Sequence, residues 1–190
     1  MSKLLKTIKS LPKEYFSIQD LRKISALDGE SLKVSLSRAV KAGEITKLVN
    51  GLYSVDTNLL SWENLAVNIY SPSYVSFESA LNYFNILSQQ AAGLTLATDK
   101  RAKEFNIQGQ IITYRHIKPD LLWGYKKVEN YLLAEPEKAF LDLAYLSLNG
   151  YGHFDPEEMN LKLLDKQKLK KYLIKFKSAK LNKLINSVLS

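Results

Sequence analysis

The spacing of apolar residues predicts two short helices at the start of the chain. Four apolar residues follow an i, i+1, i+4, i+7 pattern: Leu4, Leu5, Ile8 and Leu11. This pattern predicts a first helix that ends at Pro12. Ser17 precedes Asp20 by three residues, the spacing of a capping box, in which each side chain binds the backbone N–H of the other residue. A second helix should therefore begin at Ile18, with an apolar face of Ile18, Leu21 and Ile24.

A third helix is predicted over residues 30–42, with Asp28 or Gly29 near its N-cap and Gly43 just past its end. One side of its helical wheel is apolar, with Leu32, Leu36, Ala39 and Val40. The other side is small, hydroxylated and basic, with Glu30, Ser31, Val34, Ser37, Arg38 and Lys41, flanked by Lys33 and Ser35. Such a face suits a major groove, because short side chains permit close approach while Arg and Lys bind guanine or phosphate. A solvated helix face has a similar composition.

Residues 44–49 and 52–55 flank Asn50-Gly51, a pair typical of a type I′ β-hairpin. Three helices followed by a hairpin is the order of a winged helix-turn-helix, whose third helix enters the major groove. We therefore predict a DNA-binding domain over residues 1–56. The residues expected to contact DNA are Ser31, Lys33, Val34, Ser35, Ser37, Arg38 and Lys41 on the helix, and Lys47 and Asn50 on the hairpin. Some winged helices bind proteins, so a protein-interaction module is the alternative.

Residues 57–190 mix helical and strand patterns and predict a larger α+β domain, which makes the whole chain α+β. Helices are expected over residues 62–69, from an N-cap at Ser76 through Phe84, and from Pro136 onward. Strands are expected over residues 94–98 and 110–117, separated by a charged stretch, and between residues 121 and 133. Residues 164–189 are again helical and rich in lysine, with a break near Ser178.

Positive charge is concentrated at the two ends of the chain. The formal net charge is +8, and residues 1–55 carry +5, residues 56–155 carry −3 and residues 156–190 carry +6. Concentrated positive charge suits a nucleic acid. The chain has no Cys, which excludes disulfides and thiolate metal sites. It has no signal-peptide pattern and no apolar run that approaches the ~20 residues of a membrane span, so we expect a cytoplasmic protein without membrane association.

The acidic and histidine residues do not form the motifs of common enzymes. None of the 19 Asp and Glu residues has Lys two positions later, as a PD-(D/E)xK nuclease requires, and the Gly-Ser of nucleotidyltransferases is absent. Close acid pairs lie at predicted turns or helix starts, where capping explains them: Asp28/Glu30, Glu135/Glu137 and Asp155/Glu157. His116 and His153 show no metal-ligand spacing, and the glycines form no phosphate loop. We predict no catalytic residue, no metal and no cofactor.

Four segments resemble AbiEi-type antitoxins of type IV toxin–antitoxin systems. Residues 47–55 (KLVNGLYSV) resemble the N-terminal domain of that family. Three later segments resemble its C-terminal domain: residues 74–81 (YVSFESAL), 94–101 (LTLATDKR) and 134–142 (AEPEKAFLD). The resemblance spans most of the chain in order, and the final ~30 residues match only in their helical, lysine-rich character.

The resemblance implies a transcriptional repressor that binds repeats in double-stranded promoter DNA and regulates its own operon. It also implies an antitoxin whose C-terminal domain opposes a separately encoded nucleotidyltransferase toxin, usually without a stable complex. Such systems are associated with abortive infection by phage. A transcriptional regulator without an antitoxin role is the alternative.

Overall fold

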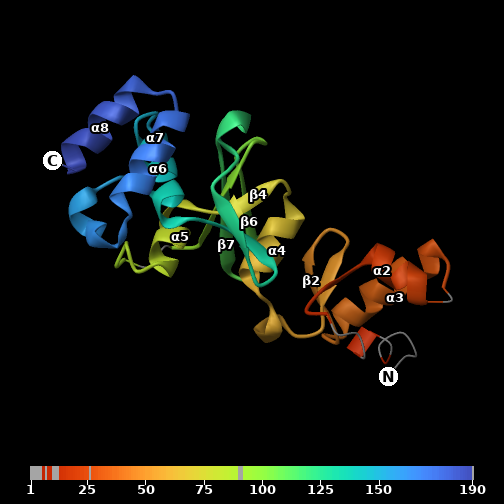
Figure 1. Ribbon diagram of the computed structural model, residues 1–190. Coiled ribbons are helices and arrows are strands. Elements are labelled where there is room, and N and C mark those ends of the chain that lie inside the picture. The colour runs from red at the N-terminus through yellow and green to blue at the C-terminus, as the bar shows by residue number, and fades with distance from the viewer. Residues whose placement is uncertain (1–5, 7, 10–12, 26, 90–91, 190) are drawn as a thin grey trace. The chain divides into compact units, whose positions relative to one another are not determined.

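The computed structural model describes residues 6, 8–9, 13–25, 27–89 and 92–189. In that part the chain is a mixed α+β structure with seven α-helices and two β-sheets (Figure 1). The chain divides into two units, Met1–Leu65 and Ala66–Ser190, and helix α4 (Trp62–Ile69) contains the division. Each unit has its own sheet. None of the helices within the described residues combines the length and the apolar composition that crossing a membrane requires.

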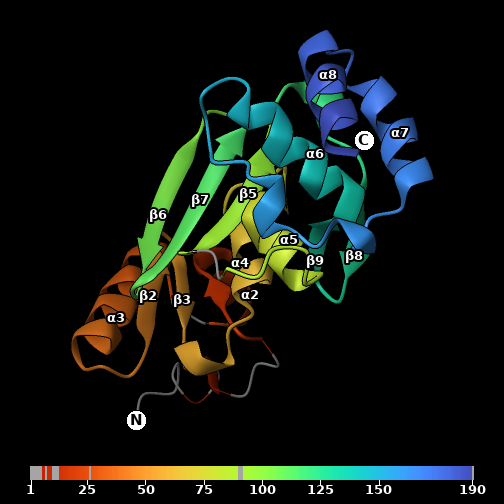
Figure 2. The ribbon, with the colours of Figure 1, turned by 90° about the vertical axis from the view of Figure 1, so that its left-hand side faces the viewer.

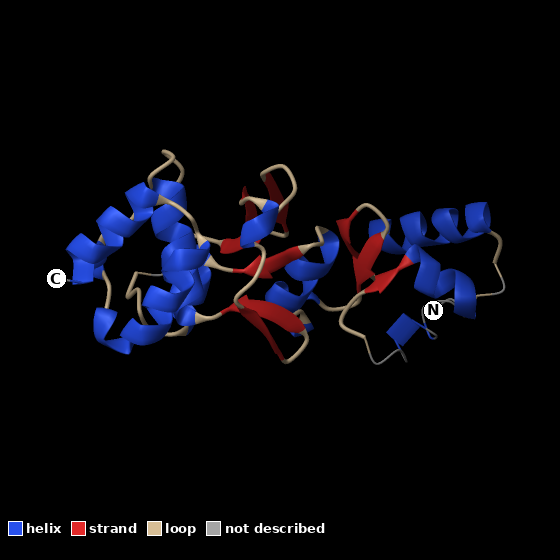
Figure 3. Ribbon diagram, turned by 45° about the horizontal axis from the view of Figure 1, so that its top comes forward, coloured by secondary structure: helices blue, strands red, loops and turns tan. Residues whose placement is uncertain are grey.

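The first unit places a small antiparallel sheet beside its helices (Figure 3). Its elements are β1 (Phe16–Ser17), α2 (Ile18–Ile24), α3 (Gly29–Lys41), β2 (Thr46–Val49), β3 (Leu52–Ser54) and the 3-10 turn η1 (Thr57–Leu59). The strand order is β1-β3-β2. Of the first predicted helix, only Lys6, Ile8 and Lys9 are described, and they are helical. The other residues of that prediction lie outside the described part.

The predicted start of the second helix is confirmed by its cap. The Asp20 backbone N–H donates to Ser17 Oγ at 3.1 Å, and the Ser17 backbone N–H donates to Asp20 Oδ2 at 2.9 Å, which completes the capping box. The Ser17 backbone bond and the Lys13 ammonium lower the pKa of Asp20 to about 2. Leu21 is buried as predicted and Ile18 packs against the same core, but Ile24 is 43% exposed and does not join it.

Helix α3 begins and ends one residue earlier than predicted, with Asp28 as its N-cap. Its predicted apolar side is confirmed, since Leu32, Leu36 and Ala39 are buried and Val40 packs against them. These side chains join a core formed by Ile8, Phe16, Leu21, Ile45 and Tyr53. Burying one such leucine contributes roughly 1.5–3 kcal/mol. One face of α3 is thus held on the core, and the other is left in solvent.

The predicted hairpin is present, but its turn is not type I′. A type I′ turn needs positive φ at both central residues. Gly51 has φ +81°, whereas Asn50 is not among the described residues with positive φ. The pairing register of β2 and β3 shifts between Lys47 and Val49. A register shift with one left-handed glycine reverses the chain, so Asn50 does not need the left-handed conformation.

The second unit is built on a six-stranded mixed sheet of order β6-β7-β5-β4-β9-β8. Its strands are β4 (Ser73–Val75), β5 (Leu94–Thr98), β6 (Lys103–Ile107), β7 (Gln110–His116), β8 (Tyr125–Val128) and β9 (Tyr131–Ala134). The pairs β5–β7 and β4–β9 are parallel. Strand β6 was not predicted, because exposed charges such as Lys103 and Glu104 hide its strand pattern. Charged side chains of this kind are common on edge strands, where they discourage pairing with another chain.

The helices of the second unit pack in succession away from the sheet. They are α5 (Phe77–Tyr83), α6 (Pro136–Ser147), α7 (Lys166–Lys175) and α8 (Ala179–Leu189). Helix α5 packs on β5, α6 on α5, α7 on α6 and α8 on α7 (Figure 2). The predicted break near Ser178 is confirmed, since Lys177 has φ +48° between α7 and α8.

Candidate nucleic-acid interface

The N-terminus of α3 is fixed by the carboxylate of Asp28. One of its oxygens accepts from the backbone N–H groups of Glu30 and Ser31, both at 2.9 Å, and the other accepts from Ser31 Oγ at 2.8 Å. The hydrogen bonds from Ser31, chiefly that of its backbone N–H, lower the pKa of Asp28. A carboxylate in this position also interacts favourably with the positive end of the helix dipole. Asp28 therefore sets where α3 starts.

Five of the predicted contact residues lie on the outward side of α3. Val34 is 48% exposed, Ser37, Arg38 and Lys41 are exposed, and Ser35 is half-buried. Within the described residues, Arg38 and Lys41 form no hydrogen bond or ion pair through their side chains. Their charges and donors are therefore available to an external anion such as a phosphate.

Two other predicted contact residues on α3 already have intramolecular partners. The Lys33 ammonium lies 2.7 Å from Glu30 Oε1, and both side chains are largely exposed. The Ser31 hydroxyl is held by Asp28. An exposed ion pair on a helix surface is weak and screened by salt, so a phosphate can displace Glu30 from Lys33. Ser31 is different, because moving its hydroxyl would disturb the helix cap.

Lys47 and Asn50 are carried by the hairpin and not by α3. Both are exposed, Lys47 on β2 and Asn50 in the turn. The Ile18 backbone N–H donates to the Gly51 carbonyl oxygen at 3.0 Å, which joins the hairpin turn to the start of α2. The hairpin is therefore anchored to the helices at its turn as well as through its strands.

One cation near α3 was not predicted as a contact residue. Arg22 is exposed in the last turn of α2, and a Cβ atom built on Gly29 would lie 3.2 Å from Arg22 Nη2. The guanidinium thus lies beside the first residue of α3, at the positive end of the helix, where it adds to the attraction for an anion. Its position in the last turn of the second predicted helix, just before the third, was the available sequence signal.

The second unit contains a buried polar network between β4 and α6. Lys138 and Asp142, one helical turn apart, form an ion pair, and both are fully buried. Lys138 Nζ donates to Tyr74 Oη at 2.7 Å, and Asp142 Oδ2 accepts from Tyr74 Oη at 2.8 Å and from Ser76 Oγ at 2.9 Å. Burial lowers the pKa of Lys138 and raises the pKa values of Asp142 and Tyr74. All four residues are shielded from solvent, so the network stabilises the fold rather than forming an open site.

The network corrects one sequence prediction. Ser76 is at the N-cap of α5 as predicted, but its side chain makes no cap hydrogen bond. Its hydroxyl donates to Asp142 instead. A buried carboxylate without donors costs more free energy than a missing cap, which explains the choice. The i, i+4 spacing of Lys138 and Asp142 on an otherwise apolar helix was the signal that we did not use.

A second correction concerns Glu135 and Glu137, which we had explained as capping residues. Glu135 is at the N-cap of α6 without a side-chain cap bond. Its carboxylate lies 2.7 Å from Lys126 Nζ and 3.2 Å from Lys168 Nζ, and it accepts from Tyr172 Oη. Glu137 also pairs with Lys168, at 3.1 Å. Burial opposes the charged form of Glu135, but its hydrogen bonds outweigh burial and lower the pKa to about 2. These contacts fasten β8 and α7 to the start of α6.

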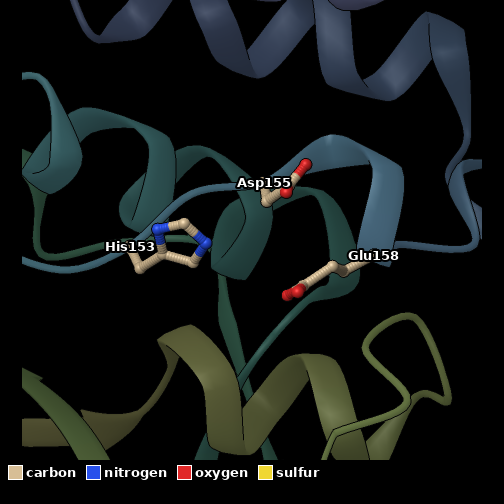
Figure 4. Close-up of side chains that lie close together, drawn as sticks. All are labelled: His153, Asp155 and Glu158. Carbon is tan, nitrogen blue, oxygen red and sulfur yellow. The ribbon is translucent and has the colours of Figure 1, made fainter.

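His153, Asp155 and Glu158 lie close together on the segment after α6 (Figure 4). One ligand atom from each lies within 4.8 Å of the others. Asp155 Oδ1 caps the backbone N–H of Glu157 at 2.9 Å, and Glu158 Oε1 accepts from Gln89 Nε2 at 3.1 Å. The group has donors for a divalent cation but, among the described residues, lacks the fourth ligand of a closed zinc site. The available sequence signal for this group is its spacing, since the three donors fall within six residues.

Comparison with known protein families finds no family that matches the chain. Comparison with curated proteins finds no match either.

Proposed function

We propose that this protein binds double-stranded promoter DNA through its first unit and represses transcription of its own operon. The observation that carries the proposal is the exposed side of α3, where Arg38 and Lys41 are unpaired among the described residues. The order of α2, α3 and the β2–β3 hairpin supports it, because it is the order of a winged helix-turn-helix. The positive charge of residues 1–55 supplies the attraction to phosphate.

In this proposal the residues of α3 read bases and the hairpin contacts the backbone or minor groove. Arg38 donates two hydrogen bonds to a guanine, and Val34 packs on a thymine methyl group. Lys47 and Asn50 contact phosphate or the minor groove. Arg22, beside the N-terminus of α3, binds a phosphate. Lys33 also binds a phosphate, which displaces Glu30 from its ammonium group.

We further propose that the protein acts as an antitoxin against a nucleotidyltransferase toxin. This part rests on the resemblance of residues 74–81, 94–101 and 134–142 to the C-terminal domain of AbiEi-type antitoxins. Residues 134–142 include Glu135, Lys138 and Asp142, which organise α6. The second unit would then oppose the toxin without forming a stable complex with it.

A protein-interaction module is the second candidate function. Ile24, Leu27 and Val34 are 43%, 39% and 48% exposed along α2, α3 and their connection. Exposed apolar side chains among cations also suit an acidic partner protein with an apolar patch. The two candidates differ in their response to DNA sequence, because only a base-reading surface distinguishes a promoter from scrambled DNA.

The test of DNA binding is a gel shift of the full chain on its own promoter beside scrambled DNA of equal length, at two salt concentrations. We expect retention of promoter DNA at about 0.15–0.2 M salt, while scrambled DNA is released. Equal retention of both DNAs, lost together as salt rises, would indicate charge attraction alone and would favour the interaction module.

Two variants separate base contacts from phosphate contacts. Arg38→Ala should weaken promoter binding by about 1–3 kcal/mol and reduce the preference over scrambled DNA. Lys47→Ala should weaken binding to both DNAs alike. Lys127→Ala is the matched control, because it removes the same charge from an exposed lysine of β8. If Arg38→Ala and Lys47→Ala both bind like Lys127→Ala, the assignment of α3 and the hairpin is wrong.

The antitoxin proposal has its own test. We expect a nucleotidyltransferase gene directly downstream of this one, and growth arrest when that gene is expressed alone. Co-expression of this chain should restore growth, and Arg38→Ala should restore it equally, since neutralisation is assigned to the second unit. Continued arrest in the presence of the folded chain would reject the antitoxin role and leave the repressor role intact.

A further inference from the structure

The second unit contains a cavity that the DNA-binding proposal does not use. It has a volume of about 400 Å³ and lies at the end of β7, beside the residue that precedes β6, the last turn of α6 and the segment that follows α6. Ala102 and the segment from Arg115 to Lys118 line one side, and Tyr145, Leu146, Asn149 and Tyr151 line the other. The volume falls in the range of small-molecule sites, which is roughly 300–1,000 Å³.

The position of the cavity in the sheet is one in which ligands commonly bind. Strands β5 and β7 are parallel neighbours, and Thr98 is paired with His116 where both strands end. The cavity is lined by the last two residues of β7, Arg115 and His116, and by Ile117 and Lys118, which follow its carboxyl end. In open α/β sheets, ligands bind in the crevice outside the carboxyl ends of parallel strands, and this cavity has the same position relative to β7.

The lining of this cavity combines aromatic and apolar side chains with basic ones. Tyr151 is 68% exposed although it is a large aromatic residue, and Tyr145, which also lines the cavity, is half-buried. Arg115 holds the Glu78 carboxylate at 2.8 Å, so its charge is already compensated. His116 Nδ1 lies 2.9 Å from the Lys100 carbonyl oxygen, which can only accept, so Nδ1 carries a proton and Nε2 remains for a ligand. Lys118 is exposed and, among the described residues, unpaired.

A second cavity of about 230 Å³ adjoins the first and shares Lys118, Tyr145 and Asn149 with it. Its other lining residues include Lys177, in the turn between α7 and α8, and Lys180, in the first turn of α8. No acidic side chain is among the described residues that line either cavity. Three lysines therefore line the second cavity without a carboxylate among them. Tyr145 lines both cavities, and Tyr151 lines the larger one.

We propose that the two cavities together bind a nucleoside polyphosphate. The base occupies the larger cavity against Tyr145 and Tyr151, and the phosphates occupy the smaller one between Lys118, Lys177 and Lys180. Inorganic phosphate alone would leave Tyr145 and Tyr151 without a partner, and an apolar ligand would leave three ammonium groups facing uncharged atoms. A ring with a polyanionic chain satisfies both compartments, because aromatic rings stack on bases and lysines bind phosphates. The proposal is independent of DNA binding by the first unit.

The first experiment is calorimetric titration of the full chain, without divalent cations and at about 0.15 M salt, with ATP, adenosine and tripolyphosphate as separate probes. We expect ATP to bind with one site per chain. Adenosine and tripolyphosphate should each bind at least about tenfold more weakly, since each fills one compartment. No heat from ATP at millimolar concentration would overturn the proposal. Tighter binding of a single-stranded oligoadenylate than of ATP would also overturn it, in favour of a nucleic-acid strand.

Variants distinguish the two compartments from general charge attraction. Lys118→Ala should weaken the binding of ATP and of tripolyphosphate by about tenfold. Lys127→Ala, which removes the same charge elsewhere, should leave the binding of both unchanged. Tyr151→Ala should weaken ATP several-fold and leave tripolyphosphate unchanged. Equal losses in Lys118→Ala and Lys127→Ala, or unchanged ATP binding in Tyr151→Ala, would overturn the assignment. Tyr151 and both lysines are exposed, so thermal unfolding should confirm that each variant folds.

Discussion

At the scale of single residues, the ammonium group of Lys138 is a buried charge that the surrounding groups must stabilise. It is enclosed with Asp142 and Tyr74, and its Nζ lies within 5.3 Å of the ring centroids of Tyr74, Trp123 and Phe176. A Cβ atom on Gly124 would lie 2.9 Å from Lys138 Cγ, and Gly124 has φ +75°. Only glycine therefore fits at position 124 without displacing Lys138. The lysine is held by an ion pair, by aromatic faces and by the close approach of the backbone.

Lys138→Met should destabilise the second unit by about 3–5 kcal/mol at neutral pH, because the Asp142 carboxylate remains buried without its cation. Burial raises the pKa of Asp142 and the Lys138 ammonium lowers it, so removing the ammonium should raise this pKa further. The loss in Lys138→Met should therefore shrink as pH falls and Asp142 takes up a proton. Urea unfolding at pH 7 and about pH 5 measures both effects.

The double variant Lys138→Met/Asp142→Asn serves as the control. Asn keeps an acceptor for Tyr74 and Ser76 but carries no charge. The double variant should therefore be more stable than Lys138→Met at pH 7, and its stability should not rise relative to the unchanged protein as pH falls. A pH-independent loss in Lys138→Met would show that packing, and not the unpaired carboxylate, accounts for the effect.

At the scale of elements, local sequence signals predicted the starts of helices better than they predicted how the elements are joined. The capping box at Ser17 and the break at Ser178 involve residues a few positions apart, so they were visible in the sequence. The cluster that joins β8, α6 and α7 was not, because Lys126, Glu135 and Lys168 are far apart in the chain. In the sequence, Glu135 looks like a helix-start residue, and its two lysine partners look like surface charge.

Glu135→Gln should make the free energy of unfolding less sensitive to acidification. The folded-state pKa of Glu135 is about 2 against an ordinary 4.5, so its contribution to stability is present above about pH 4.5 and is lost as pH falls toward 2. We expect this contribution to be on the order of 2 kcal/mol at neutral pH, reduced by the solvent exposure of Lys126. Glu135→Gln should lose it at pH 7 and show a flatter stability curve between about pH 4.5 and 2.

The matched control is Glu129→Gln, which neutralises an exposed carboxylate in the turn between β8 and β9. Its stability curve should follow that of the unchanged protein. Equal curves for Glu135→Gln and the unchanged protein would mean that Lys126, Lys168 and Tyr172 do not stabilise the charged form.

At the scale of the whole molecule, the chain has two separate cores. The first unit is organised around Leu21, Leu32 and Leu36, and the second around β5, α5 and α6. The charge follows a different division, because most of the mildly acidic middle and the whole basic C-terminal segment belong to the second unit, while Asp56 and Glu63 belong to the first. Net charge along the sequence therefore does not mark the boundary between the units.

Variants in the two cores should act on different unfolding transitions. Leu36→Ala should cost about 2–5 kcal/mol in the first unit, because Leu36 is fully buried and its removal leaves a cavity. Lys138→Met should act on the second unit. Scanning calorimetry should show two transitions, each lowered by one variant only. A single transition lowered as a whole by either variant would mean that the units unfold together.

The sequence alone determined the features that depend on neighbouring residues. These are the mixed α+β class, the capped starts of α2 and α3, the buried side of α3 and the presence of the hairpin at Asn50-Gly51. Helix periodicity, caps and turn residues act over a few positions, so they can be recognised without knowing the fold.

Only the tertiary structure decided which distant residues meet. It placed Ser76 on Asp142 instead of on its helix, made β6 an edge strand, and brought Lys118 beside Lys177 and Lys180. The free energy of a buried charge or a shared cavity depends on every group packed around it, and those groups come from elements far apart in the sequence. Their partners therefore cannot be derived from local pattern.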